Sequence, residues 1–216
     1  MCSSSPCNFV NTWWTYPIPG GSGLASTLGF AQWVSYQSAL SPYCGVVPVS
    51  LVVAQWGLET CWGDTFGTYS NPANQASTCC YPQCGWEPNG TIPQFCDLDA
   101  GVKSFAQLLI AGYPHVAQAY SLCGQPGSND LSGAAKALGI GYYAFQAVSD
   151  GFCGGPASIS SSSPRIWATS GYNDGGGPGS GLIDSINANT CLSNLNYVQT
   201  SDPQIPDFPS TYLAPC

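Results

Sequence analysis

The stretch VPVSLVVAQWGLETCWG, residues 47–63, predicts the central helix of the fold. Pro48 suits the first turn of a helix, because its missing N–H group needs no partner there. Apolar side chains then recur at helical spacing from Val49 to Trp56, which predicts one buried face. Gly63 marks the predicted end of the helix.

Glu59 lies near the end of this helix and is one of two glutamates in the chain. At 100° per residue, it falls about 60–80° from the centre of the buried face, one turn after Gln55. Burial and the negative end of a helix dipole both favour the protonated form of a carboxyl group. The general acid of a glycosidase needs that form. A glutamate near a helix end is more commonly a solvated surface residue, so position alone leaves both interpretations open.

The charge of the chain restricts its partners. The 216 residues include three Lys+Arg and eleven Asp+Glu, which gives a net charge of −8. Such a surface repels phosphate backbones and anionic membranes, so we expect no nucleic acid and no membrane among the partners. No apolar run is long enough to predict a membrane-spanning helix.

Twelve cysteines spread along the chain predict a disulfide framework, and therefore an oxidising, extracellular compartment. Zinc is the weaker alternative. Cys79, Cys80 and Cys84 have near-ligand spacing, but the chain has one histidine, His115, and no paired CxxC motifs. We expect no metal and no cofactor, and the spacing leaves the disulfide pairing open.

The chain reads as a single domain with two flanking segments. Residues 1–23 are rich in Pro, Gly and Ser and predict an irregular N-terminal arm, and residues 24–196 form the domain. Residues 197–216 predict a Pro-rich C-terminal strap tied down by Cys216. Predicted helices cover 24–40, 48–63, 99–111, 115–122, 131–138 and 182–189, with Asp99 and Asp130 as N-caps and an edge strand at 91–95 in a loop-rich lobe.

Several segments follow one another in the order typical of one family. Residues 54–63 match an AQ-x-x-LES-x-WG helix motif at Ala54, Gln55, Leu58, Glu59, Trp62 and Gly63, and NPAN at 71–74 is similar to the turn that follows it. FCDLDAGVKSFAQLL at 95–109, WATSGY at 167–172 and PGSGLIDSINAN at 178–189 resemble later segments. From about residue 46 to 195 the chain resembles bacterial glucosaminidases, the endo-β-N-acetylglucosaminidases of autolysins and flagellar peptidoglycan hydrolases.

This resemblance implies a mainly α (α+β) fold: a lysozyme-like helical domain with a small loop-rich β-lobe, here disulfide-rich. It implies Glu59 as the catalytic general acid, with Gln55 and Asn71 in the substrate site. Tyr172 matches a tyrosine of the family's later motif. Trp167 stands where the family has another tyrosine, which keeps a stacking face but removes a hydroxyl group.

The second catalytic carboxylate is less defined. Glu87, in CGWEPNG, is the candidate for a base or an electrostatic stabiliser, and an exposed turn residue is the alternative. Asp97 and Asp99 compete with it, although a helix cap explains Asp99 better. Asp64 is a candidate supporting residue near the helix end.

Aromatic side chains are the candidate sugar platforms, because their faces stack on the C–H surfaces of pyranose rings. The candidates are Trp62, Trp86, Trp167 and Tyr172, and core packing is the alternative for each of them.

The leading hypothesis is a secreted glycosidase that cleaves the β-1,4 bond after N-acetylglucosamine in peptidoglycan or a related polysaccharide. The alternative is a non-catalytic protein with a lysozyme-like fold that binds carbohydrate or forms an extracellular assembly. The high cysteine content and the Pro- and Gly-rich segments at both ends of the chain would suit self-assembly of this kind. A serine triad is poorly supported, because the chain has one histidine and no G-x-S-x-G motif.

Overall fold

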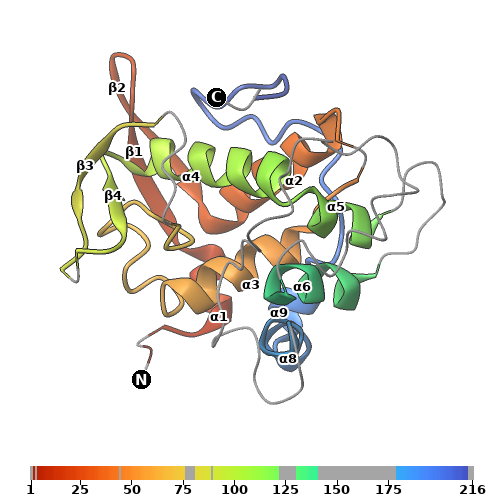
Figure 1. The fold of residues 1–216 in the computed structure, drawn as a ribbon. Helices are drawn as coiled ribbons and strands as arrows, with labels where there is room; N and C mark the ends of the chain where they lie inside the picture. The colour runs from red at the N-terminus through yellow and green to blue at the C-terminus, as the bar shows by residue number, and fades with distance from the viewer. Residues whose placement is uncertain are drawn as a thin grey trace.

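The computed structural model describes residues 2, 4–43, 45–75, 81–88, 90–121, 130–140 and 179–213. Most secondary structure in these ranges is helical, and the strands form two separate two-stranded antiparallel sheets. Three helices cross the middle of the molecule, and the strands lie at one side (Figure 1): these helices are α2 (Thr27–Leu40), α3 (Val49–Glu59) and α4 (Leu98–Gln107). The prediction of a mainly helical α+β fold is confirmed.

Helix α3 lies in the core, as its apolar sequence predicts. Pro48 is its N-cap, and every residue from Val49 to Gly57 is buried. The Trp56 ring packs against Phe66 and Phe105, with centroid distances of 5.4 and 5.2 Å. A helix that is apolar on all sides is stable where other elements surround it. Helix α3 ends at Glu59, four residues before the predicted end at Gly63.

The predicted irregular arm at residues 1–23 is wrong in its secondary structure. These residues form helix α1 (Pro6–Asn11), strand β1 (Trp13–Ile18) and the start of strand β2 (Gly21–Ser26). The two strands pair as an antiparallel hairpin, which leaves α2 to begin at Thr27 rather than at 24. The Ser26 hydroxyl caps α2 by accepting a hydrogen bond from the Gly29 amide.

Helix α4 confirms the predicted helix near residue 99 and corrects its cap. Asp97, not Asp99, is the N-cap, and its carboxylate accepts a 2.8 Å hydrogen bond from the Ala100 amide. Asp99 lies in the first turn and forms a 2.7 Å ion pair with Lys103. The helix continues into η1, a π-helix at Leu108–Gly112.

Four more helices complete the described core: α5 (Pro114–Tyr120), α6 (Leu131–Ile140), α8 (Ser180–Ala188) and α9 (Thr190–Ser193). Asp130 caps α6 as predicted, because its carboxylate accepts a 2.8 Å hydrogen bond from the Gly133 amide. Gly179, with φ of 79°, allows α8 to start against α6, since a Cβ atom there would lie 2.3 Å from the Ala135 backbone.

The C-terminal strap crosses α2 and α4 as an extended segment, described up to residue 213 (Figure 1). Side chains from the core bind its backbone carbonyl groups. Tyr16 donates to Pro206, Trp33 to Pro209 and Tyr36 to Ser210. The predicted anchor at Cys216 lies outside the described residues.

Three disulfides confirm the disulfide interpretation for six cysteines: Cys2–Cys61, Cys7–Cys191 and Cys84–Cys96. Cys84 is therefore not available for the zinc alternative. Within the described ranges, no three His, Cys, Asp or Glu side chains gather as metal ligands, and no helix is long and apolar enough to cross a membrane. Cys79 and Cys80 are outside those ranges.

Candidate active site

Glu59 is the last residue of α3 and is half-buried. The chain turns immediately afterwards, because the Thr60 amide and hydroxyl both donate to the Trp56 carbonyl, at 2.9 and 2.7 Å. The Trp62 amide then donates to the Gly57 carbonyl at 2.7 Å. The buried helix and this tight turn together fix the backbone that carries Glu59.

Three consecutive residues after the turn have left-handed backbones: Cys61 (φ 53°), Trp62 (φ 58°) and Gly63 (φ 104°). Residues other than glycine rarely adopt this conformation, at a cost of about 1–3 kcal/mol each. Long-range contacts hold them there. Cys61 is bonded to Cys2, and the Trp62 ring meets Phe9 edge-on at 6.2 Å. We call residues 60–63 the α3 corner.

The α3 corner places the Trp62 indole away from Glu59. A Cβ atom added to Gly57 would lie 2.1 Å from the Trp62 ring, so the indole covers α3 at Gly57. Residues 57 and 59 are about 160° apart around a helix. Trp62 therefore packs on the opposite side of α3 from Glu59, as a partly buried structural residue.

Gln55 lies on the same side of α3 as Glu59, because four residues advance a helix by about 400°. Its side chain is fully buried, and among the described residues neither its Oε1 nor its Nε2 has a hydrogen-bond partner. The same holds for Nε1 of Trp56. Buried polar atoms are normally paired, so the Gln55 amide is an exception among the buried side chains of α3.

The NPAN turn is attached to Glu59 through its second asparagine. Asn74 Nδ2 donates a 2.6 Å hydrogen bond to the Glu59 carbonyl, and Asn74 has φ of 45°, which asparagine tolerates. Asn71 has a structural role: its Nδ2 donates to the carbonyls of Gln75 and Pro93, and its Oδ1 accepts from the Gln75 amide. Asn74 is the contact that sequence analysis missed, although the NPAN motif contained it.

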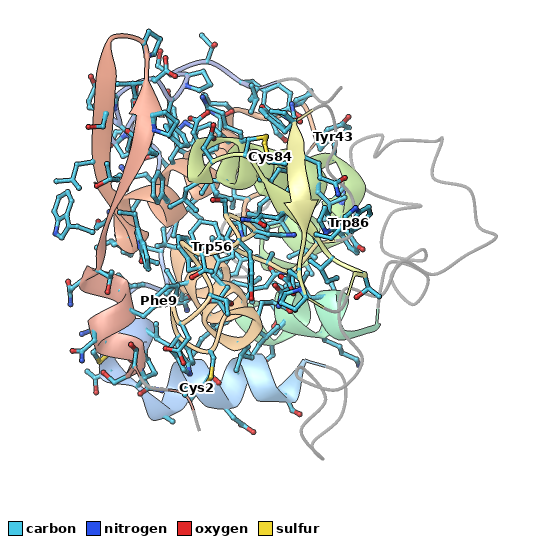
Figure 2. The ribbon with its side chains drawn as sticks, turned by 90° about the vertical axis from the view of Figure 1, so that its left-hand side faces the viewer. Cys2, Phe9, Tyr43, Trp56, Cys84 and Trp86 are labelled. Atoms are coloured by element: carbon cyan, nitrogen blue, oxygen red, sulfur yellow. A yellow bond between two sulfur atoms is a disulfide. The ribbon has the colours of Figure 1, made fainter. Side chains whose placement is uncertain are left out.

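The β-lobe consists of strands β3 (Gln83–Trp86) and β4 (Pro93–Phe95), which the Cys84–Cys96 disulfide joins. The predicted edge strand at 91–95 is thereby confirmed. Trp86 is 58% exposed, and Figure 2 shows it on the hairpin while Trp56 lies in the interior. An exposed indole on a short, cross-linked hairpin is available for stacking.

Glu87 follows β3 and is half-buried. One carboxylate oxygen, Oε1, is buried and has no hydrogen-bond partner in the part of the chain that the structure describes. Burial raises the pKa of Glu87 above its ordinary value. Glu87 is thus a carboxyl group whose surroundings favour its neutral form.

Backbone contacts join the β-lobe to the segment that follows Glu59. The Phe95 amide donates to the Tyr69 carbonyl at 3.2 Å, and Asn71 reaches the Pro93 carbonyl at 2.8 Å. Pro93 is the strand partner of Trp86, the residue before Glu87. The loop at residues 60–75 therefore connects the two glutamates through one continuous hydrogen-bonded framework.

The competing aspartates have other partners. Asp97 caps α4, and Asp99 pairs with Lys103. Burial, together with the nearby Asp97 and Asp207 carboxylates, keeps the pKa of Asp99 above its ordinary value despite this cation. Asp64 is exposed in the loop after the α3 corner. Trp167 and Tyr172 lie outside the described residues. Of the predicted site residues, Gln55 and Glu59 lie one turn apart on α3, and Trp86 and Glu87 are consecutive residues at the end of β3.

Comparison with protein-family models, with curated proteins and with solved structures found no match for the chain.

Proposed function

We propose that this protein is a secreted glycoside hydrolase that cleaves the β-1,4 bond after N-acetylglucosamine in peptidoglycan or a related polysaccharide. One observation carries the proposal: Glu59 is half-buried and ends the helix that lies buried in the core. The chain places a carboxyl group at that point although charged residues make up 6% of its sequence. The raised pKa of Glu87 supports the proposal, because perturbed carboxyl groups cluster at functional sites.

In the proposed reaction, the Glu59 carboxyl group donates its proton to the glycosidic oxygen as the bond to the anomeric carbon breaks. Water supplies the hydroxyl group that ends on the anomeric carbon. Either Glu87 accepts a proton of this water, or the acetamido oxygen of the substrate first attacks the anomeric carbon. In the second route, water then opens the resulting ring and gives its proton to the Glu59 carboxylate. Gln55 is fully buried, so we assign it no contact with the substrate.

We propose that Trp86, and not Trp62, provides the aromatic face on which a sugar ring stacks. Trp86 is 58% exposed on the β-lobe, next to Glu87, and its face suits a pyranose ring. Trp62 packs between Phe9 and Gly57, so its contribution to the site is to hold the α3 corner.

The test compares Glu59→Gln with wild type on purified peptidoglycan and on chito-oligosaccharides, from about pH 4 to about pH 8. Loss of the general acid should lower the release of reducing ends at least about 100-fold. Asp184→Asn is the control, because it neutralises an exposed carboxylate on α8 that has no proposed role in the site. Equal activity of wild type and Glu59→Gln would remove Glu59 from the mechanism, and an inactive wild type would defeat the hydrolase proposal.

A non-catalytic, carbohydrate-binding role is the second candidate, and the exposure of Trp86 supports it independently of Glu59. In that case, wild type and Glu59→Gln should bind chito-oligosaccharides equally and cleave none. A self-assembling structural protein would instead appear in light scattering as a species larger than a monomer.

A further inference from the structure

The docked part of the C-terminal strap, residues 205–213, is held through its backbone. The core contributes the side chains that bind it: Tyr16 from β1, Trp33, Tyr36 and Gln37 from α2, and Lys103 from α4. We call these side chains the strap-binding surface. They lie between 104 and 190 positions away from their partners in sequence. The strap is therefore bound as a separate peptide would be, by contacts that do not depend on its connection to the core.

Phe208 is the side chain that fixes the strap in one position along this surface. It is 7% exposed. Its ring packs on three aromatic rings of the core, those of Tyr16, Phe30 and Trp33, at centroid distances of 5.5, 5.3 and 4.8 Å. The Lys103 ammonium group lies 4.8 Å from the centre of the Phe208 ring and donates a 2.9 Å hydrogen bond to the Asp207 carbonyl. A buried aromatic side chain between backbone hydrogen bonds is a common way to recognise an extended peptide.

The connector before the docked part, residues 200–204, is attached differently. Among the described residues its hydrogen bonds are local: Gln199 Nε2 donates to the Ser201 carbonyl, and the Gln204 amide donates to the Asp202 carboxylate at 2.8 Å. Gln204 has φ of 58°, which is strained for a residue other than glycine. A short connector that contains a strained turn favours release of the terminal segment and its binding to another copy.

We propose that the strap-binding surface of one copy binds the strap of a second copy, so that two copies exchange their straps reciprocally. The exchange needs no new contact, because the hydrogen bonds and the Phe208 packing form between copies as they do within one copy. Straightening of the connector at Gln204 relieves its strained turn. The tether gives a copy's own strap an effective concentration in the millimolar range, so exchange belongs to crowded conditions. It does not depend on the proposed hydrolase activity.

The first measurement uses a labelled synthetic peptide of residues 203–213 and the full-length variant Phe208→Ala, whose own strap has lost its buried ring. In fluorescence anisotropy, the peptide should bind this variant at least about tenfold more tightly than wild type, whose strap already occupies the surface. The same peptide carrying Phe208→Ala is the matched control and should bind at least about tenfold more weakly. If circular dichroism shows Phe208→Ala to be unfolded, Phe208→Leu replaces it, since leucine keeps an apolar side chain there. Failure of the peptide to bind the folded variant overturns the proposal.

The second measurement follows wild type by light scattering up to about millimolar concentration, where exchange should compete with the tethered strap. A dimer should form, and excess strap peptide should return it to monomers. Gln204→Gly should shift dimer formation to at least about fivefold higher concentration, because glycine removes the strain from the monomer. A wild type that stays monomeric, or a dimer that the peptide does not dissociate, overturns the proposal. Glu59→Gln should dimerise like wild type, which separates this proposal from the hydrolase proposal.

Discussion

Residues near Glu59 and Glu87 are held by specific contacts, and only some of these contacts can be predicted from the sequence. The position of Glu59 near a helix end follows from the apolar spacing of α3. Its contact with Asn74 does not, because the 2.6 Å hydrogen bond depends on how the loop at 60–75 folds back. Likewise, the raised pKa of Glu87 arises from burial in the folded β-lobe, which a sequence cannot measure.

Glu87→Gln should change how stability depends on pH. Burial raises the pKa of Glu87 in the folded state, so the folded protein holds this proton up to a higher pH than the unfolded chain does. Stability from this group is present below the unfolded pKa and falls as pH rises through the folded pKa. Relative to wild type, Glu87→Gln should therefore gain stability as the pH rises above the ordinary glutamate pKa of about 4.3.

Urea denaturation across this range measures the effect, and Asp184→Asn, at an exposed position on α8, is the control. A difference between Glu87→Gln and wild type that stays constant with pH would contradict the raised pKa.

At the scale of secondary structure elements, α3 and its corner act as one unit. The indole of Trp62 lies on Gly57, and the corner backbone is left-handed at three successive residues. The absence of a side chain at residue 57 is therefore what permits the corner to close on the helix.

Gly57→Ala should destabilise the protein by about 1–3 kcal/mol, because the new methyl group would lie 2.1 Å from the Trp62 ring. In a Trp62→Ala background the same change should be neutral or stabilising by up to about 1 kcal/mol, since alanine favours helix over glycine. Chemical denaturation of the four proteins of this double-mutant cycle measures the coupling. Equal costs in both backgrounds would show that Trp62 does not cover Gly57.

The helices that were predicted correctly carry a pattern or a capping residue within their own stretch of sequence. Helices α3 and α4 have apolar periodicity, and α6 has Asp130 as its cap. Cap prediction failed at Asp99, because an aspartate stands two residues earlier at Asp97 and either could begin the helix. The β1–β2 hairpin was missed because its stability comes from packing on α2 and the strap, and strand preference depends on such context.

At the scale of the whole molecule, side chains of the core hold the C-terminal strap through hydrogen bonds to its backbone. Gln37 is fully buried in α2, and its Nε2 donates to the carbonyls of Pro209 and Thr211, both at 3.0 Å. Its Oε1 accepts a 2.7 Å hydrogen bond from the Leu213 amide. A single glutamine thus makes hydrogen bonds to three residues of the strap, Pro209, Thr211 and Leu213, which the proline content of this segment did not predict.

Gln37→Ala should destabilise the protein by about 2–4 kcal/mol, because three hydrogen bonds are lost and buried backbone groups lose their partners. Hydrogen exchange at the Leu213 amide should accelerate strongly in this variant. Gln32→Ala is the matched control on the same helix, where an exposed amide donates to the Tyr197 hydroxyl. Equal stability of the two variants would argue against Gln37 as the anchor of the strap.

The Cys7–Cys191 disulfide has a consequence for how breaks in the chain would be detected. It joins α1 to α9 across 184 positions of sequence, so most of the polypeptide forms a covalent ring. A protease that cuts once between these two cysteines opens the ring but releases no fragment. Such a nicked molecule would gain the mass of one water and otherwise pass as intact until a thiol reductant separates its pieces.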